Sequence, residues 1–355
     1  MKKISVLIVD DSAFVRKAVM RMLSMAKDIE VVGSASDGNE AIQKVAALRP
    51  DIVTLDVQMA GMDGLTALDR IMREAPTRVL MLSSLTREGA ETTIRALELG
   101  AVDFIDKARA ESSMDISLLG NELISKIRAI AGVDVEKVKA GQTGASNAQA
   151  APMEQHTHPT HVPLRAGLVD VVAIGTSTGG PPALQAIIPR LPIDFPAGVI
   201  VVQHMPPGFT RTLAERLNSQ SSLMVFEAAD GDVVQPGRVL VAPAGRHFLL
   251  RRRNGMYVVH LDDEPSDSLH KPSVDVMMES VAKACGKKSL GVLLTGMGSD
   301  GAKGMRAIKE AGGRTLAESE ETCIVYGMPK SAVEEGAVDK VVPLYNMTSE
   351  IMKSV

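Results

Sequence analysis

The sequence lacks tryptophan, and aromatic residues make up only 3% of its 355 residues. Its two cysteines, Cys285 and Cys323, are too few for a disulfide framework, which excludes the class of disulfide-stapled secreted domains and fits a reducing compartment. No apolar run approaches the roughly 18 residues that span a bilayer, and the N-terminal run turns acidic at Asp10, too early for a secretory signal. We therefore expect a cytoplasmic location without direct membrane insertion.

The sequence also lacks an excess of either charge. Lys and Arg number 39 and Asp and Glu number 43, which gives a formal net charge of -4. Nucleic-acid-binding domains usually carry clustered positive charge with aromatic platforms, whereas the basic run 251–253 lies in a strand-like stretch without such platforms. The second half also lacks a compact basic helix-turn-helix. We expect no nucleic-acid partner.

The length of the chain and one shift in composition predict its domains. A chain of 355 residues exceeds what one hydrophobic core usually holds, so two domains are expected. Residues 141–163 are small, polar and proline-containing, with neither helical nor strand periodicity, which is typical of a linker. The sequence thus predicts a first domain over residues 1–132, a flexible linker over 133–166 and a second domain over 167–355.

In the first domain, β-rich runs such as ISVLIVD and DIVTLD alternate with amphipathic helical runs. This alternation predicts an α/β fold with a parallel, doubly wound sheet. In such sheets the functional residues gather beyond the carboxyl ends of the strands. Five polar residues at these ends should share one pocket: Asp10, Asp11, Asp56, Ser83 and Lys107.

The acidic members of this pocket predict a metal site. Three carboxylates held together repel one another unless a cation lies among them, so Asp10, Asp11 and Asp56 favour Mg²⁺. Asp56 is then the candidate phosphoryl acceptor, with Lys107 pairing with the phosphoryl group and Ser83 donating a hydrogen bond to it. Taken alone, the Asp-Asp pair would as often cap the following helix. The other strand-end residues favour the metal site.

Residues 4 to about 130 resemble a bacterial response-regulator receiver domain. The segments that carry the resemblance are LIVDD, DIVTLDVQMAGMDGL, VLMLSS and GAVDFIDK. The resemblance implies a flavodoxin-like fold with strand order 2-1-3-4-5, Mg²⁺ at the acidic cluster, and phosphorylation of Asp56 by a histidine kinase. It also implies that Phe104 is a switch aromatic that reorients as Ser83 moves toward the phosphoryl group. Asp106 departs from the family pattern, because its charge beside Lys107 weakens the positive field of that lysine.

The second domain repeats the alternation of apolar and helical runs from residue 168 onward, which again predicts a doubly wound α/β fold. The stretch RVLVAPAGRHFLLRRRNGMYVVHLD interrupts it, with strands close together and an Asn-Gly pair between them. This pattern predicts an antiparallel hairpin attached to the main sheet.

The segment GTSTG fits the pattern G-x-S-x-G, in which a serine on a sharp strand-to-helix turn exposes its hydroxyl. The serine is Ser177, and it needs a base and a carboxylate that orients the base. His204 closes the strand VIVVQH and Asp300 follows LLTGMGS, so these three residues form a candidate triad. Three other histidines are weaker candidates, two because they lie in the predicted hairpin and one because it lies in a polar loop: His247, His260 and His270.

The glycine loop TGMG adds a candidate for transition-state stabilisation, because backbone N–H groups of such a loop can face a developing oxyanion. The amide of Met297 is our candidate donor. Each group alone has a simpler interpretation, since a serine in a glycine turn or an acid before a helix usually acts as a helix cap. A phosphate cradle at GTSTGG is disfavoured, because the segment lacks the Gly-Lys-Ser/Thr ending of a P-loop.

Residues 168 to about 352 resemble the catalytic domain of the chemotaxis protein-glutamate methylesterases, the CheB family. The segments IGTSTGG, VVQHMPPGFT, LLTGMGSDGAKG and ETCIVYGMPKSA carry this resemblance. It implies a Ser177, His204 and Asp300 triad, with Thr178 as a neighbour and the Met297 amide holding the oxyanion. It implies no metal in this domain. Thr176 stands where the family often has alanine.

The two resemblances together imply a phosphorylation-regulated serine hydrolase. It would demethylate glutamate γ-methyl esters, and deamidate certain glutamines, on methyl-accepting chemotaxis receptors. The implied partners are a chemotaxis histidine kinase and methylated receptors. We expect the unphosphorylated receiver to restrict access of a receptor helix to the esterase, with the linker permitting release. The alternative is a receiver-linked, non-catalytic adaptor that binds receptors.

Overall fold

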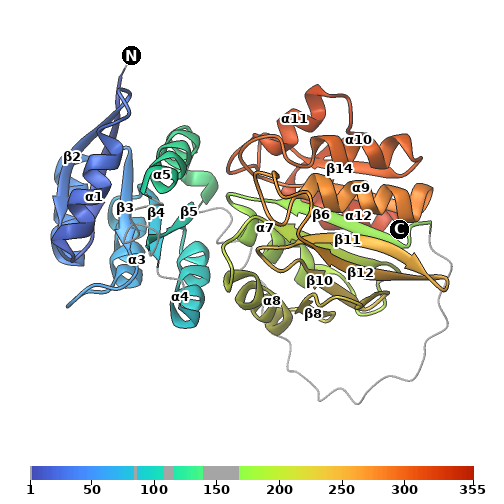
Figure 1. Cartoon of the computed structure of the whole chain (residues 1–355). Helices are drawn as coiled ribbons and strands as arrows, with labels where there is room; N and C mark the ends of the chain where they lie inside the picture. The colour runs from blue at the N-terminus through green and yellow to red at the C-terminus, as the bar shows by residue number, and fades with distance from the viewer. Residues whose placement is uncertain (1, 84–85, 108–115, 139–167) are drawn as a thin grey trace. The chain divides into compact units, whose positions relative to one another are not determined.

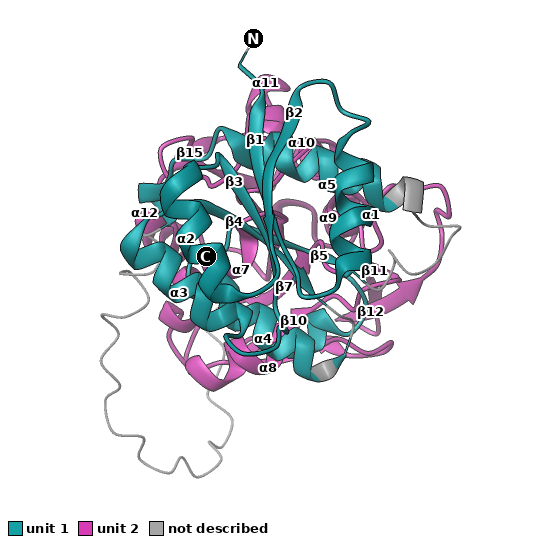
Figure 2. Ribbon diagram, turned by 90° about the vertical axis from the view of Figure 1, so that its left-hand side faces the viewer, with its two compact units in different colours: residues 1–140, 206–212 teal, residues 141–205, 213–355 magenta. Residues whose placement is uncertain are grey.

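A computed structural model describes residues 2–83, 86–107, 116–138 and 168–355 (Figure 1). The chain divides into two compact units, residues 1–140 with 206–212 and residues 141–205 with 213–355 (Figure 2). Residues 139–166 of the predicted linker lie outside the described residues, so the predicted domain bounds stay a prediction.

The first unit contains a parallel five-stranded sheet in the order β2-β1-β3-β4-β5. Its strands are β1 (Ile4–Val9), β2 (Ile29–Ala35), β3 (Ile52–Asp56), β4 (Arg78–Ser83) and β5 (Asp103–Asp106). Its helices are α1 (Ala13–Leu23), α2 (Gly38–Leu48), α3 (Gly64–Glu74), α4 (Arg87–Glu98) and α5 (Ile116–Ala131). Helix α1 packs against α5, whereas α3 packs against α2 and α4. The predicted fold and strand order are confirmed.

Local sequence explains where the helices of this unit begin. Side-chain oxygens accept hydrogen bonds from backbone N–H groups three residues later at the starts of α1 to α4, and the capping residues are Ser12, Asp37, Asp63 and Thr86. The turn between β3 and α3 requires glycine, because a Cβ at Gly64 would lie 2.0 Å from the backbone oxygen of Asp56. Helix α3 thus begins directly against the end of the strand that carries Asp56.

The second unit is built on a seven-stranded sheet in the order β15-β14-β13-β6-β7-β10-β8, in which every pair is parallel. Its strands are β6 (Val171–Thr176), β7 (Gly198–Gln203), β8 (Met224–Glu227), β10 (Arg238–Val241), β13 (Ser289–Leu293), β14 (Arg314–Glu318) and β15 (Lys340–Val342). Strands β6 and β7 are buried at every residue. This is why their sequences are continuous apolar runs and not alternating ones.

A small antiparallel sheet, β11-β12-β9, adjoins the main sheet. The predicted hairpin consists of β11 (His247–Arg253) and β12 (Met256–Asp262). Asn254 and Gly255 turn the chain between them with φ of 50° and 80°, as the Asn-Gly pair predicts. Strand β9 (Val233–Val234) adds a third strand, and its two residues are too short to show a strand period in the sequence.

The helices of the second unit are α7 (Gly180–Ile187), α9 (Val274–Cys285), α10 (Ala302–Glu310), α11 (Met328–Glu334) and α12 (Leu344–Ser354). Helix α8 (Phe209–Gln220) begins within residues 206–212, which belong to the first unit, and continues in the second. Helix α9 packs against α10 and β11, and α7 packs against α12. The core joins Phe248 and Leu250 of β11 to Met277, Met278 and Val281 of α9. This packing fixes α9 in the core, and the first residues of α9 contact Asp300 in the loop after β13.

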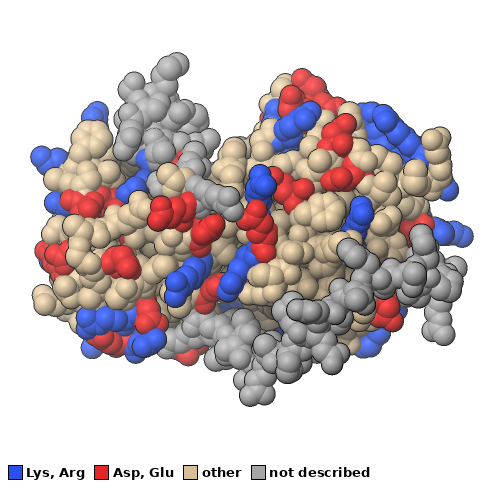
Figure 3. All heavy atoms as spheres, turned by 90° about the horizontal axis from the view of Figure 1, so that it is seen from below, with Lys and Arg blue, Asp and Glu red and all other residues tan. Residues whose placement is uncertain are grey.

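Both cysteines are buried, and neither lies in a disulfide of the described residues. No helix within the described ranges is long and apolar enough to cross a membrane. On the face drawn in Figure 3, Lys and Arg side chains are interspersed with Asp and Glu side chains, in keeping with the small net charge.

Candidate active site

The candidate triad residues follow three neighbouring strands of the seven-stranded sheet. Strands β13, β6 and β7 are adjacent and parallel, so the chain leaves all three at the same edge. Ser177 comes directly after β6, His204 directly after β7, and Asp300 lies in the loop after β13. The structure therefore brings together the three residues predicted from the sequence.

Ser177 lies on a turn that only glycines permit. Gly179 has φ of 77°, and a Cβ there would lie 2.6 Å from the Ile324 side chain. A Cβ at Gly180 would lie 1.9 Å from Oε1 of Gln203. Helix α7 therefore starts at Gly180, and Ser177 stays partly exposed on a sharp strand-to-helix turn. This is the local geometry that the G-x-S-x-G pattern predicts.

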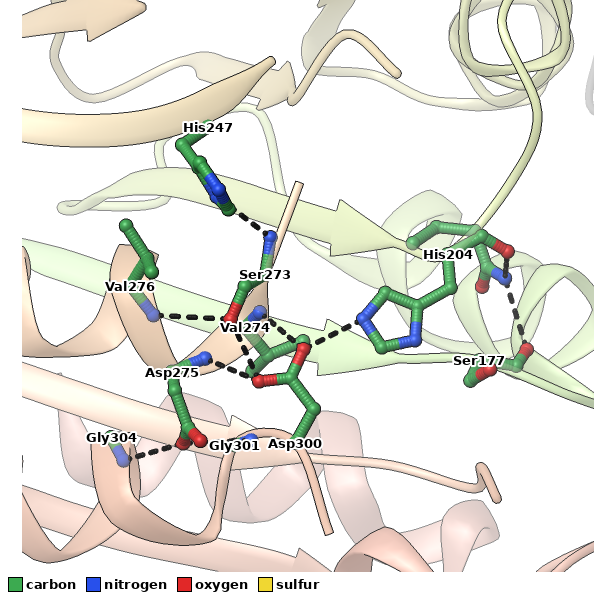
Figure 4. Close-up of polar contacts among 11 residues, drawn as sticks. Ser177, His204, His247, Ser273, Val274, Asp275, Val276, Asp300, Gly301 and Gly304 are labelled. Atoms are coloured by element: carbon green, nitrogen blue, oxygen red, sulfur yellow. Dashed lines mark hydrogen bonds and ion pairs between the residues drawn. The ribbon is translucent and has the colours of Figure 1, made fainter. Parts of the chain in front are cut away.

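His204 is oriented by Asp300. The imidazole Nε2 lies 2.8 Å from Oδ2 of Asp300. The other ring nitrogen, Nδ1, is buried and has no hydrogen-bond partner within the described part of the chain. In Figure 4 the ring lies between the Asp300 carboxylate and Ser177. A neutral ring that donates from Nε2 to Asp300 leaves Nδ1 as its proton acceptor.

Asp300 accepts hydrogen bonds from the start of α9. Its carboxylate receives the N–H groups of Val274 at 2.8 Å and Asp275 at 2.9 Å and the hydroxyl of Ser273 at 2.8 Å (Figure 4). Burial alone would raise the pKa of Asp300, but the contact with His204 and these N–H groups hold that pKa well below its usual range. Asp300 is therefore an anion at neutral pH and can stabilise a protonated His204.

Asp275 is a second buried carboxyl beside Asp300. Its Oδ1 accepts the N–H groups of Gly301 and Gly304, each at 2.8 Å, at the start of α10. Burial first, and the charge of Asp300 to a lesser degree, raises the pKa of Asp275 to about 6. Sequence reasoning missed this residue. The sequence signal that could have identified Asp275 is an acidic residue in the first turn of a helix that begins Ser-Val-Asp.

The TGMG loop lies directly against the nucleophile turn. The backbone oxygen of Thr295 accepts the Ser177 N–H at 3.0 Å and the Thr176 hydroxyl at 2.9 Å. The Thr295 hydroxyl donates to the backbone oxygen of Thr178 at 2.9 Å. A Cβ at Gly296 would lie 2.9 Å from the Ser177 Cβ. Met297 and Thr178 are thus near neighbours of the serine, and the oxyanion role of the Met297 amide stays a prediction.

Glu318, at the end of β14, is a further residue that sequence reasoning missed. Its carboxylate is fully buried; it accepts the Thr295 N–H at 2.9 Å and the Thr322 hydroxyl at 2.9 Å. A glutamate that closes an apolar strand, RTLAE, is the signal that could have found it. Through Thr295, Glu318 holds the loop that touches the serine.

The other histidines have different surroundings. His247 is buried, and its two nitrogens face the Pro265 oxygen at 3.1 Å and the Ser273 N–H at 3.3 Å. His260 lies between Asp230 and Asp262. The ring of His270 stacks on His204, with centroids 4.0 Å apart and planes at 19°. His270 therefore belongs to the site, although its sequence context gave only a polar loop.

The three acidic residues predicted for the receiver pocket lie together. Asp10, Asp11 and Asp56 offer oxygens that all lie within 4.8 Å of one another. Oδ2 of Asp10 is buried and accepts no hydrogen bond from any residue that the structure describes. Burial, and then the charge of Asp56, raises the pKa of Asp10 to about 6. An acidic cluster with an unsatisfied buried oxygen is a donor set that fits a hard divalent cation.

Lys107 contacts the candidate phosphoryl acceptor, and Ser83 ends β4, the strand beside the one that carries Asp56. The Lys107 ammonium lies 2.7 Å from Oδ2 of Asp56 and 3.9 Å from Oδ2 of Asp10. Burial raises the pKa of Asp56, although the Lys107 ammonium acts in the opposite direction. The Ser83 hydroxyl lies 2.6 Å from that of Thr93, a buried residue of α4 that sequence reasoning missed. This hydrogen bond links Ser83 to helix α4, and the sequence pattern did not predict that contact.

Phe104 lies on β5, shortly before Lys107 in the sequence. The ammonium of Lys126 lies 5.5 Å from the centroid of its ring and donates to its backbone oxygen at 2.7 Å. Asp106, two residues on, is buried and pairs in register with Ser83. The switch role of Phe104 stays a prediction.

The two folds and the site define a class: a response-regulator receiver joined to an α/β unit with the side-chain set of a serine hydrolase. Comparison with protein families matches residues 172–351 to the CheB methylesterase family and residues 6–117 to the response regulator receiver domain. The chain belongs to the CheB methylesterase family.

Similar proteins match over the full length. One is the protein-glutamate methylesterase/protein-glutamine glutaminase 1 of Oleidesulfovibrio alaskensis, 44% identical over 99% of each chain. Another is protein-glutamate methylesterase/protein-glutamine glutaminase 3 of Geobacter sulfurreducens, 46% identical over 99% of this chain and 98% of that one. Among solved structures, the Thermotoga maritima CheB methylesterase catalytic domain matches 53% of this chain and 99% of its own, with 47% identity and a TM-score of 0.52.

Proposed function

We propose that this protein is a phosphorylation-regulated serine hydrolase that demethylates glutamate γ-methyl esters on methyl-accepting chemotaxis receptors. By the same route it deamidates specific receptor glutamines. The observation that carries the proposal is the His204–Asp300 pair, which leaves Nδ1 of His204 without a partner among the described residues, on the side of Ser177. The names of the full-length relatives favour this enzyme over a non-catalytic adaptor.

The first half of the reaction forms an acyl-enzyme. Ser177 Oγ attacks the ester carbonyl carbon while Nδ1 of His204 takes the hydroxyl proton, and the Asp300 anion stabilises the resulting imidazolium. The carbonyl oxygen becomes an oxyanion, which the Met297 amide stabilises. When the carbonyl reforms, the bond to the methoxy oxygen breaks, and His204 returns the proton so that methanol leaves.

The second half restores the enzyme. His204 takes a proton from water, whose oxygen attacks the acyl carbon of the Ser177 ester. The bond to Ser177 Oγ then breaks, and Oγ receives the proton back. The product is a free glutamate side chain on the receptor. With a glutamine substrate, the same steps release ammonia in place of methanol. This unit uses only its own side chains and backbone, so we propose no metal in it.

The receiver unit accepts a phosphoryl group on Asp56 from a chemotaxis histidine kinase. Asp10, Asp11 and Asp56 would hold Mg²⁺, which when bound offsets the charge of the carboxylates and of the phosphoryl group. Lys107 pairs with the phosphoryl oxygens and Ser83 donates a hydrogen bond to them. Phe104 then repacks as Ser83 moves. We place these events, and the receptor tails that the enzyme modifies, in the cytoplasm.

Methanol release from methylated receptor membranes tests the catalytic proposal. Wild-type protein should release methanol, and Ser177→Ala should release it at less than about a thousandth of the wild-type kcat, because removing a serine nucleophile costs several orders of magnitude. The partly exposed hydroxyl contributes little packing, so circular dichroism should show a folded variant. A folded Ser177→Ala with more than about a tenth of wild-type kcat contradicts the assignment, and an inactive wild type supports the adaptor.

A further inference from the structure

Gln203 is the last residue of β7 and directly precedes His204. The residue is only 2% exposed. Its amide Nε2 donates to the backbone oxygens of Ser177 and His204, each at 3.0 Å. One side-chain group therefore joins the backbones of the two residues that we propose as nucleophile and base.

The surrounding hydrogen bonds make this link part of a fixed frame. The Ser177 N–H donates to Thr295, and the Ser177 oxygen also accepts the Gly180 N–H at 2.8 Å. The His204 N–H donates to the Thr176 oxygen at 3.2 Å. Together with the two bonds from Gln203, these contacts give the backbone N–H and carbonyl groups of both Ser177 and His204 hydrogen-bond partners. Two N–H groups on one neutral nitrogen suit two carbonyl oxygens, and an ionised carboxylate has no proton to offer them.

The other end of the Gln203 side chain argues against a role in packing alone. Its Oε1 is buried and has no hydrogen-bond partner in the described ranges of the chain. It lies where any Cβ at Gly180 would come within 1.9 Å. A buried acceptor without a partner is unfavourable for folding. An apolar side chain of the same length would fill this space without that penalty, so packing alone does not explain a glutamine here.

We infer that Gln203 is a positioning residue that keeps Ser177 and His204 at the separation that proton transfer needs. The inference rests on the proposed function. Gln203 reaches the reaction only through backbone groups of Ser177 and His204, so its loss should lower kcat and leave KM nearly unchanged. A displacement of about 1 Å between reacting groups can reduce a rate about a hundredfold.

Two variants of the full-length protein separate the donor role from packing. Gln203→Met keeps the length of the side chain and removes both N–H groups. Gln203→Glu keeps the shape and, when ionised, sets negative charge against two carbonyl oxygens. Gln185→Met is the matched control, because Gln185 is also a largely buried glutamine of this unit and lies on α7. Circular dichroism of each variant confirms folding before kinetics are measured.

Methanol release from methylated receptor membranes should give kcat values about tenfold to a hundredfold below wild type for Gln203→Met and at least about a hundredfold below for Gln203→Glu at pH 8. KM should stay within about threefold, and Gln185→Met should match wild type. The deficit of Gln203→Glu should shrink as pH falls, because a protonated carboxyl can donate to one carbonyl again, whereas that of Gln203→Met should not change. Values of kcat within twofold of wild type for both variants, or losses in KM alone, overturn the inference.

A second readout distinguishes this inference from the proposed function. A fluorophosphonate probe labels an activated serine whatever the natural substrate is. If wild type releases no methanol but Ser177 is labelled, the proposed substrate is wrong. Slower labelling in Gln203→Glu and Gln203→Met then still supports positioning, and labelling at the wild-type rate in both overturns it. An unlabelled Ser177 in wild type overturns both.

Discussion

A histidine ring carries two nitrogens, and the partner of one decides what the other can do. Nε2 of His204 faces Asp300 at 2.8 Å, whereas Nδ1 is buried with no hydrogen-bond partner in the part of the chain that the structure describes. In His247, the nitrogens face the Pro265 oxygen and the Ser273 N–H. His204 therefore has a nitrogen to offer a serine proton, and His247 does not.

Histidine substitutions test this difference. His204→Ala should lower kcat for methanol release about as severely as Ser177→Ala, because members of a catalytic set act as a unit. His247→Ala should keep kcat within about tenfold when folded, although it loses stability because the Ser273 N–H and the Pro265 oxygen lose their partner. Thermal unfolding and initial methanol rates measure the two effects. Equal losses of kcat in both variants would mean that His204 is not the specific base.

The carboxyls of Asp275 and Asp300 have opposite pKa shifts, so they contribute oppositely to the pH dependence of stability. The pKa of Asp300 is lowered, so its stabilising contribution is present above its unfolded pKa and is lost only in acid. Burial raises the pKa of Asp275 from 3.8 to about 6. The protonated form of Asp275 is therefore favoured in the folded state. Its contribution to the stability of the fold is lost as pH rises through about 6.

The substitution Asp275→Asn tests the direction of this pH dependence of stability. The asparagine oxygen can still accept the Gly301 and Gly304 N–H groups, both of which bind Oδ1. Relative to wild type, the variant should gain stability between pH 5 and pH 8, on the order of 1 kcal/mol. Because the sequence has no tryptophan, circular dichroism is the suitable probe of urea unfolding. If the stability of the variant relative to wild type falls over this pH range, the raised pKa of Asp275 is contradicted.

At the scale of elements, continuous apolar runs and glycine turns made the sheets and strand-end residues predictable. Ser177, His204 and Asp300 follow adjacent strands, so topology alone brings them together. The sequence could not reveal contacts between distant segments. Asp300 binds the start of α9, 26 residues earlier, at Val274, and Glu318 binds Thr295 across 23 residues. Such contacts depend on side-chain packing and backbone direction, which periodicity does not encode.

Thr295 is the residue through which β13, β14 and the nucleophile turn are connected, so its hydroxyl should matter for catalysis. Thr295→Val removes the bond to the Thr178 oxygen and the one accepted from the Val325 N–H, and should lower kcat about tenfold or more through misplacement of Ser177. Thr295→Ser keeps the hydroxyl and should stay within about threefold of wild type. Methanol release measures both rates. Equal activity of the two variants would show that the hydroxyl is dispensable.

At the scale of the whole molecule, each unit has its own sheet and its own polar pocket at strand ends. The first brings Asp56 and Lys107 together, and the second brings Ser177, His204 and Asp300 together. A phosphoryl group on Asp56 need not touch Ser177 to change its rate, because charge added in one pocket can repack residues such as Phe104 around it. The two units should therefore be separable experimentally.

Removing the receiver tests how it acts. We predict that an attached, unphosphorylated receiver restricts the approach of a bulky receptor helix. Residues 168–355, expressed alone, should then have higher basal methanol release than the unphosphorylated full-length chain. Full-length protein should gain activity with a small-molecule phosphodonor and Mg²⁺. Asp56→Asn should fold, keep the low basal rate and fail to respond, since it lacks the acceptor oxygen anion. If residues 168–355 are slower than the unphosphorylated full-length chain, inhibition by the receiver is wrong and the receiver must contribute positively to catalysis.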